Sequence, residues 1–154
     1  MKYFQQLDMT DCGAACISMI ASHYGKTTNI AEVREYAGTD IIGTNINGLL
    51  IASKKIGLKG TAVKGSQKVI SKKLSVPFIA HMRIKRDESN YIDHYIVVKK
   101  INKKNIIIWD PDPIIKKQKV NYEKFFEAWT GYAVFLEPTT EFEKSEKKQN
   151  LFLK

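Results

Sequence analysis

The sequence predicts an α+β fold in which N-terminal helices pack on a mostly antiparallel sheet. Capped helical patterns occupy roughly the first sixty residues, and after Gly57 the pattern changes to short strands rich in β-branched residues. The length of 154 residues is typical of one domain with its own hydrophobic core. Helices followed by strands joined through short turns therefore favour one domain with a helical layer and a sheet layer.

Three helices are expected in the first part of the chain. The first spans about residues 12–23, the second lies within "NIAEVREYAG", and the third lies within "NINGLLIASKKIG". Each is preceded by a residue whose side chain can cap the first turn, namely Thr10 or Asp11, Asn29, and Asn45 or Asn47. Each is followed by a glycine suited to a helix end, namely Gly25, Gly38 and Gly57.

The rest of the chain predicts strands, in the segments "LKGTAVK", "PFIAHMRI", "DHYIVVKKI", "NIIIW" and "GYAVFLE". A short helical turn fits "VISKKL", and a helix capped by Asn121 fits "NYEKFFEAW". We expect residues 1–138 to form the domain. The charged residues 139–154 are expected to be a linker or tail that leads toward a region outside this chain.

The composition argues against several classes of protein. Apolar residues make up 44% and charged residues 27%, which is ordinary globular usage and predicts neither disorder nor a membrane protein. The longest apolar runs are far shorter than the roughly 18 residues that span a bilayer. The N-terminus has no apolar core of signal-peptide length. We therefore expect the chain to stay in the cytoplasm.

The net charge of +9 does not by itself predict a nucleic-acid-binding protein. It comes from lysine pairs spread along the chain, and only three of the 25 basic residues are arginines. Nucleic-acid readers favour clustered arginine and stacking aromatic residues, and neither pattern is present. A lysine-rich solvated surface is the favoured interpretation, with an anionic membrane surface or acidic partner as the alternative.

Two cysteines lie at the start of the first predicted helix. Cys12 falls in the first turn, where unpaired backbone amides and the positive end of the helix dipole favour a thiolate, so it is a candidate nucleophile. Cys16 lies one turn further on among apolar residues and is expected to be a buried structural thiol. The spacing alone leaves open whether Cys12 is reactive.

A cysteine nucleophile needs an imidazole to take its proton, and the chain has three histidines. His23 lies too far along the helix of Cys12 to reach the thiol. His81 and His94 both lie on predicted strands and could both face the start of that helix. His94 is followed, one strand later, by acids in "WDPDP" that could orient its ring.

The register of that hairpin bears on the choice between Asp110 and Asp112. A two-residue turn at Lys103 and Lys104 puts Asp110 on the wrong face of the sheet relative to His94. A three-residue turn puts Asp112 opposite His94 and leaves Asp110 one diagonal away, at roughly 7 Å between Cβ atoms. The prolines of this segment cannot donate ladder hydrogen bonds, which favours Asp110. Taken alone, "WDPDP" is more typical of a turn with exposed acids.

Gln6 lies just upstream of the cysteine. Acyl transfer needs donors aimed at the developing oxyanion, and an amide side chain here could act beside the backbone amide of Cys12. Gln5 is the competing candidate, and a lone loop glutamine is usually just solvated.

These residues together resemble the C39 peptidase family, which comprises double-glycine leader peptidases fused to transporters for bacteriocins and competence peptides. The resemblance rests first on "QLDMTDCGAACISMI" and continues through "GTNINGLLIASKKIGL", "VPFIAHM", "DHYIVV", "WDPDP" and "AWTGYAVFLEP". It covers about residues 1–138, with the Cys, His and Asp blocks in family order.

The resemblance implies a papain-like fold and a cysteine peptidase that cuts a peptide precursor after a Gly-Gly pair. It implies Cys12 as nucleophile, His94 as base and then acid, Asp110 as the group that orients His94, and Gln6 in the oxyanion hole. It gives His81 no catalytic role, and it implies no metal or cofactor. The implied location is the cytoplasmic side of a bacterial cell membrane, with the transmembrane and nucleotide-binding domains of a transporter as partners.

The printed sequence holds neither a membrane span nor a G-x-x-x-x-G-K-[ST] motif, so we expect it to be the peptidase domain of such a transporter. The alternative from another class is a non-catalytic domain that only tethers the leader peptide. The joint presence of Cys12, His94 and Asp110 argues against it. A nucleic-acid or anionic-surface binder is the remaining hypothesis, and it would lose affinity steeply with salt.

Overall fold

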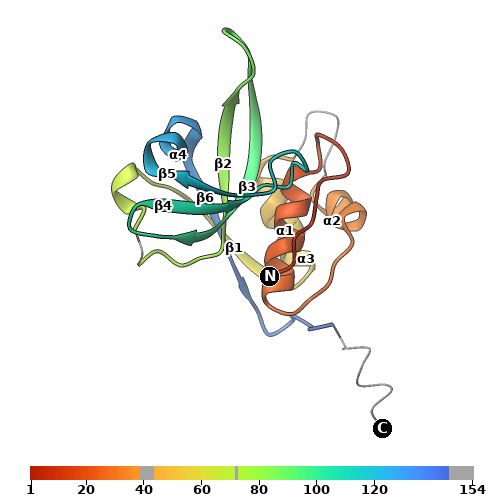
Figure 1. Cartoon of the computed structure of the whole chain (residues 1–154). Coiled ribbons are helices and arrows are strands. Elements are labelled where there is room, and N and C mark those ends of the chain that lie inside the picture. Colours follow the sequence, from red (N-terminus) through yellow and green to blue (C-terminus); the bar gives the residue numbers. More distant parts are fainter. Residues whose placement is uncertain (39–43, 72, 146–154) are drawn as a thin grey trace.

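The computed structural model describes residues 1–38, 44–71 and 73–145 and has an α+β architecture (Figure 1). Three helices from the N-terminal third lie together on one face of a six-stranded sheet. A short fourth helix packs against the opposite face of the sheet. The predicted fold class is therefore confirmed.

The N-terminal helices lie where the caps and glycines predict them: α1 (Cys12–His23), α2 (Ile30–Tyr36) and α3 (Ile46–Lys55). The side chains of Asn29 and Asn45 accept hydrogen bonds from amides in the first turns of α2 and α3. Asp11 precedes α1, but its side chain makes no capping hydrogen bond. The carboxylate of Asp11 instead contacts Arg34 and the Asp8 amide, which are described with the candidate active site below.

Helix α1 is a core helix rather than an amphipathic surface helix. Ten of its twelve residues are buried, because α2 and α3 pack against it on one side and strand β3 on the other. Its small residues allow this close packing: a Cβ at Gly13 would lie 2.8 Å from the Leu49 side chain of α3. The start of α1 is thereby held against the sheet.

All pairings in the sheet are antiparallel, in the order β1-β6-β2-β3-β4-β5. The strands are β1 (Leu58–Lys64), β2 (Phe78–Lys85), β3 (Tyr91–Ile101), β4 (Asn105–Trp109), β5 (Lys117–Asn121) and β6 (Trp129–Pro138). Two cores result. One joins α1, α2 and α3 to the sheet, and the other covers the opposite face around Phe78 and Phe125 of helix α4 (Tyr122–Ala128).

Two local predictions need correction. Strand β5 was not expected from the sequence, because only one of its five residues, Val120, is buried and lysines point to solvent, as is usual on an edge strand. The helical turn expected within residues 69–74 is a 3-10 turn, η1 (Gln67–Val69), that ends where that segment begins. Residue 72 lies outside the described residues.

The β3–β4 hairpin combines features of both registers considered from the sequence. Its turn has two residues, because the Asn102 amide donates to the Asn105 carbonyl at 2.8 Å and Ile101 pairs with Ile106. A β-bulge at Lys99 then shifts the register, so that Val97 pairs with Trp109. Of the two turns considered, the two-residue turn is the one present, yet the bulge restores the register that places His94 and Asp110 on one face.

Residues 139–145 continue beyond β6 and pack against the domain. Thr139 donates two hydrogen bonds to the Gly57 carbonyl at 2.9 Å, and the Ser145 amide donates to the Gly25 carbonyl at 3.0 Å. Gly57 has φ of 89°, and a Cβ there would lie 2.6 Å from the Phe142 backbone, so this segment requires a glycine. The predicted linker at 139–154 therefore begins with residues that contact the ends of α1 and α3, and residues 146–154 lie outside the described part.

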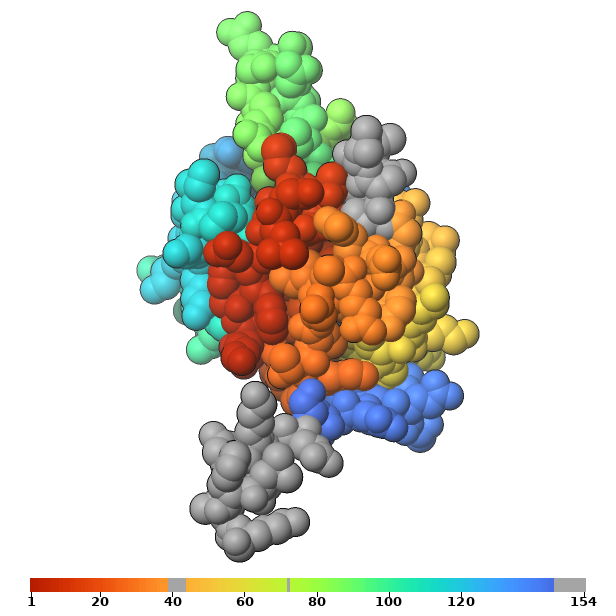
Figure 2. Space-filling model, turned by 90° about the vertical axis from the view of Figure 1, so that its right-hand side faces the viewer, coloured from red at the N-terminus to blue at the C-terminus, as the bar shows by residue number. Residues whose placement is uncertain are grey.

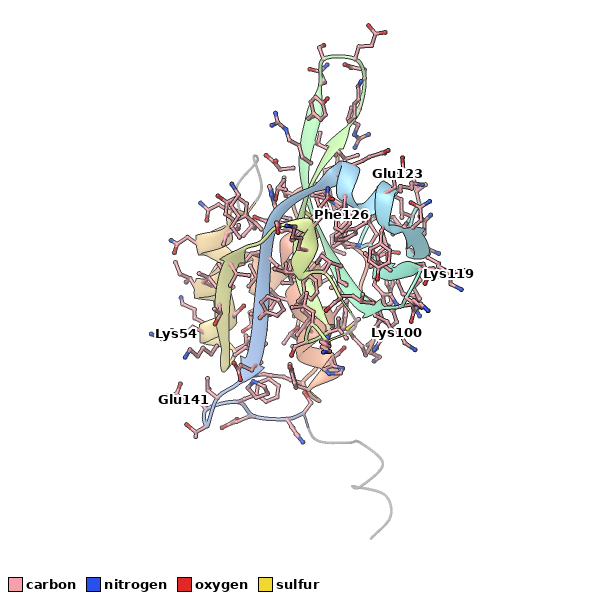
Figure 3. All side chains as sticks on the ribbon, turned by 90° about the vertical axis from the view of Figure 1, so that its left-hand side faces the viewer. Lys54, Lys100, Lys119, Glu123, Phe126 and Glu141 are labelled. Carbon is pink, nitrogen blue, oxygen red and sulfur yellow. The ribbon has the colours of Figure 1, made fainter. Side chains whose placement is uncertain are left out.

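The lysine side chains are spread over the surface. Figure 3 shows Lys54 on the side of the helices, whereas Lys100 of β3 and Lys119 of β5 lie on the opposite side of the view. This distribution agrees with a solvated surface rather than a single basic patch. Among residues 1–38, 44–71 and 73–145, no helix has the length and apolarity needed to cross a bilayer.

Candidate active site

Three side chains from separate elements meet where α1 begins. Cys12 is the first residue of α1, His94 lies on β3, and Asp110 follows β4. The thiol of Cys12 interacts with the His94 ring closely enough to raise the pKa of that ring. His94 Nε2 lies 2.7 Å from Asp110 Oδ1, which leaves Nδ1 as the ring nitrogen available to the thiol. The packing of α1 across β3 produces this arrangement.

Several hydrogen bonds fix the position of Asp110. Its Oδ1 also accepts a hydrogen bond from the Asp112 amide at 2.8 Å, and its backbone carbonyl accepts one from the Tyr3 hydroxyl at 2.6 Å. Asp112 has a different task, because its Oδ1 accepts from the Ile114 amide at 2.9 Å. Of the two acids in "WDPDP", the structure thus brings Asp110 to His94 and uses Asp112 to shape the following loop.

The environment of His94 favours its protonated form. Burial lowers the pKa of the ring, but hydrogen bonds and charge interactions with Asp110 and Cys12 outweigh that effect and raise it to about 10. A charged imidazole at this position can give its proton to a leaving group, which is the general-acid half of acyl transfer.

The other cysteine and histidines lie outside this cluster. Cys16 is fully buried, and burial raises the pKa of its thiol, so it is a poor nucleophile. His23 lies at the far end of α1. His81 Nδ1 lies 2.9 Å from the Thr130 hydroxyl, and burial lowers the pKa of the His81 ring.

Gln6 lies at the edge of an open cleft that His94 also lines. Its backbone amide donates to the Pro111 carbonyl at 2.9 Å, which fixes the N-terminal loop to the loop after β4. Its side-chain Oε1 is buried without a hydrogen-bond partner among the described residues. Because Oε1 is an acceptor, a donor role for Gln6 rests on its amide nitrogen and on its place at the cleft, whereas Gln5 is exposed and lines no part of the cleft.

The structure also reveals an ion pair between a buried acid and a partly exposed arginine that the sequence does not predict. The Asp11 side chain is fully buried beside Cys12, and its carboxylate lies 3.1 Å from Arg34 Nη1 of α2. It also accepts a hydrogen bond from the Asp8 amide at 3.1 Å. Arg34 thus supplies a positive charge next to the buried Asp11 carboxylate at the start of α1. An acid before a helix is usually a cap, so only the packing of α1 on α2 reveals this role.

In the described part of the chain, no three His, Cys, Asp or Glu side chains gather as a metal site would require. The side chains that do meet at the start of α1 are a thiol, an imidazole and a carboxylate, the groups used in nucleophilic acyl transfer.

Comparison with known proteins identifies relatives along almost the whole chain. The sequence model of the Peptidase C39 family matches residues 1–141. The lactococcin transport/processing ATP-binding protein LcnC-like of Lactococcus lactis is 36% identical over 99% of this chain and 21% of its own length. The transport/processing ATP-binding protein ComA of Streptococcus pneumoniae is 34% identical over 96% of this chain and 20% of its own length. The chain thus spans about a fifth of these relatives.

Solved structures agree with this result. The peptidase domain of Streptococcus ComA, described as a bifunctional ABC transporter of a quorum-sensing pathway, superposes with a TM-score of 0.81 at 35% identity, covering 90% of this chain and all of that one. A double-glycine-motif protease from an AMS/PCAT transporter, solved with its leader peptide, gives a TM-score of 0.77 at 26% identity, covering 90% and 91% of the two chains.

Proposed function

We propose that this chain, which belongs to the Peptidase C39 family and has its papain-like fold, is a cysteine endopeptidase that cuts a peptide precursor after a Gly-Gly pair. The observation that carries the proposal is the buried His94–Asp110 hydrogen bond, together with the buried Cys12 at the start of α1, which raises the pKa of His94. A thiol, an imidazole and an orienting carboxylate in this order are the groups that nucleophilic acyl transfer requires.

The reaction proceeds in two stages. His94 Nδ1 holds the proton of Cys12, and Sγ attacks the carbonyl carbon of the second glycine. His94 then gives its proton to the leaving amine as the C–N bond breaks, which leaves a thioester on Cys12. In the second stage His94 takes a proton from water, whose oxygen attacks the thioester and releases the leader with a free carboxylate. Neither stage requires a metal or cofactor.

Two other residues support these stages. Asp110 fixes the His94 ring through Nε2 and stabilises its positive charge. Gln6 supplies a side-chain donor that, with the Cys12 backbone amide, stabilises the oxyanion of the tetrahedral intermediate. The position of Gln6 at the cleft and the exposure of Gln5 support Gln6 for this role.

The substrate and partners follow from the relatives. One similar structure is described as a double-glycine-motif protease bound to a leader peptide, and two similar proteins are transport/processing ATP-binding proteins. We assign residues 1–138 to the peptidase domain and 139–154 to a linker toward the transmembrane part of a longer transporter. The peptidase would then act at the cytoplasmic side of the cell membrane, with transmembrane and nucleotide-binding domains as partners.

The test is incubation of the chain with a precursor peptide that carries a Gly-Gly leader, followed by mass spectrometry of the products. One cut after the second glycine is expected, and it should disappear in Cys12→Ala while leader binding persists. Binding without any cut by the unmodified chain would instead establish the tethering function. Cleavage that survives in Cys12→Ala would remove the assignment of the nucleophile.

A further inference from the structure

A cleft of about 670 Å3 extends outward from His94 and has largely apolar walls. Three segments line it: the β2–β3 hairpin, the N-terminal loop before α1, and the loop after β4. Figure 2 shows these segments in green, red and cyan, next to one another on one face of the molecule. Their apolar contributions to the cleft are Met9, Ile84, Ile92, Ile114 and Ile115.

Two of the side chains that line the cleft are largely exposed to solvent. Met9 is 66% exposed and Ile114 is 91% exposed. Single exposed apolar residues are common, but two that line one cleft together with a candidate catalytic histidine are typical of a binding site.

The loop that carries Ile114 is fixed by its own hydrogen bonds. Asp112 accepts from the Ile114 amide through Oδ1 and from the Ile115 and Lys116 amides through its carbonyl, at 2.9–3.0 Å. The Asp112 amide in turn donates to Asp110 Oδ1, the atom that contacts His94. Ile114 is therefore preorganised in position relative to the His94 ring.

The direction of the substrate in this cleft follows from the reaction. His94 protonates the leaving nitrogen, so that nitrogen and the residues after it lie on the His94 side of the scissile carbon. The leader stays attached to Sγ of Cys12 at that moment. The cleft is lined by His94 but not by Cys12, so it lies along the path of the departing chain.

We propose that this cleft binds the first residues after the scissile bond, and that it prefers an apolar side chain there, packed between Met9 and Ile114. This inference rests on the proposed peptidase function and adds a specificity site to it. Charge should select little, because Arg86 in the wall is offset by Asp93 and Asp112. The selectivity should come from burial of apolar surface, including the exposed area of Ile114.

The first experiment compares two precursors that are identical through the Gly-Gly pair. Their second and third residues after the cut are both leucine or both asparagine, which differ in polarity but not in charge, and one of two adjacent side chains in an extended segment faces the apolar wall. We expect the leucine precursor to have about tenfold higher kcat/KM. Ile114→Asp should remove this preference, and Ile114→Leu should retain it.

The matched control is Val69→Asp on η1, which replaces another exposed apolar residue outside the cleft and should leave the preference unchanged. The rate of Cys12 alkylation by iodoacetamide should be the same in all variants, which shows that the site is intact. Equal kcat/KM for the two precursors, or a preference that survives Ile114→Asp, would refute the cleft assignment while leaving the peptidase function standing.

A second experiment does not depend on cleavage. In Cys12→Ala, hydrogen exchange at the amides of Ile114, Ile115 and Lys116 should slow with the leucine precursor but not with a leader peptide that ends at Gly-Gly. Slowing by both peptides would place the leader in the cleft and overturn the proposal. If neither peptide bound or was cut by the unmodified chain, the leader-peptidase function itself would fail, and this inference with it.

Discussion

Two histidines on neighbouring strands each lie beside a carboxylate, but their surroundings differ. His94 Nε2 lies 2.7 Å from Asp110 Oδ1, and both side chains are almost fully buried. His81 Nε2 lies 3.5 Å from Asp93 Oδ1, and the Asp93 side chain is 74% exposed. Water around Asp93 weakens its attraction for an imidazolium, whereas the buried Asp110 is screened much less.

The pKa values of the two rings shift in opposite directions as a result. Burial lowers both, but at His94 the interactions with Asp110 and Cys12 prevail and raise the pKa to about 10. At His81 the charge of Asp93 does not offset burial, and nearby His94 lowers the pKa further. A carboxylate therefore keeps a buried imidazole charged only where the carboxylate is itself shielded from water.

The hydrogen bonds of His81 show that it has a structural role. The Thr130 hydroxyl donates to the His81 carbonyl at 3.0 Å, so it accepts a hydrogen bond from Nδ1–H of the ring. The ring is then a neutral donor that ties β2 to β6. Within the described residues, neither cysteine is among the groups that shift the pKa of the His81 ring, whereas Cys12 is one of those that shift the pKa of His94.

The largest difference in kcat is expected when each histidine is replaced by alanine in turn. His94→Ala should lower kcat for cleavage of the Gly-Gly precursor by about 10⁴-fold, the upper range for general acid–base catalysis. His81→Ala should change kcat less than about threefold, because its ring contacts no reacting group. Initial rates with mass-spectrometric product analysis measure both. A large loss of kcat in a folded His81→Ala variant would break the distinction between the two sites.

Replacing the carboxylates beside the two histidines should change kcat in the same order as replacing the histidines, but by smaller factors. Asp110→Asn should lower kcat by about 10³-fold, because the amide no longer stabilises the imidazolium or fixes its tautomer. Asp93→Asn and Asp112→Asn serve as controls, and both should retain nearly full kcat. If Asp112→Asn were the damaging change, Asp112 rather than Asp110 would be the orienting group.

The two histidine sites also differ because the Gln6 side chain lines the same cleft as His94. Gln6→Ala should lower kcat by about 10²-fold with little change in KM, since an oxyanion donor acts mainly in the transition state. Gln5→Ala is the matched control, and its kcat should be unchanged. If Gln5→Ala lowered kcat and Gln6→Ala did not, Gln5 rather than Gln6 would be the oxyanion donor.

The sequence predicts most of what depends on local chemistry. The caps at Asn29 and Asn45 and the glycines after each helix give the bounds of α1–α3 to within a residue or two. The placement of Cys12 at the start of α1 is predicted for the same reason, because the first turn is defined by neighbours in sequence.

What the sequence does not predict depends on contacts between distant segments. The bulge at Lys99 decides the face of Asp110, but no residue there demands a bulge. The pairing of Asp11 with Arg34 exists only because α2 packs on α1. The choice of His94 over His81 came from family resemblance, since both lie on strands that face α1 and only burial of the neighbouring acid separates them.

The dependence of stability on pH should also separate the two histidines. The pKa of His94 is raised on folding, so its contribution is present below its unfolded pKa and is lost as pH rises toward about 10. The pKa of His81 is lowered, so its contribution is present above its unfolded pKa and is lost on acidification. Urea unfolding across this range should show less alkaline loss in His94→Gln and less acid loss in His81→Gln. Identical pH profiles for both variants would mean that neither ring changes its protonation on folding as described.

The smallest effect tests the structural role of His81 through its partner. Thr130→Val keeps the shape of the side chain but removes the hydroxyl that accepts from His81 Nδ1 and donates to the His81 carbonyl. The free energy of unfolding should fall by about 1–2 kcal/mol, because a partly buried N–H and a carbonyl lose their partner. Thr130→Ser retains the hydroxyl and should recover most of that loss, whereas kcat should stay unchanged in both variants. A fall in kcat with Thr130→Val but not with Thr130→Ser would connect His81 to catalysis, since the hydroxyl reaches the active site only through that ring.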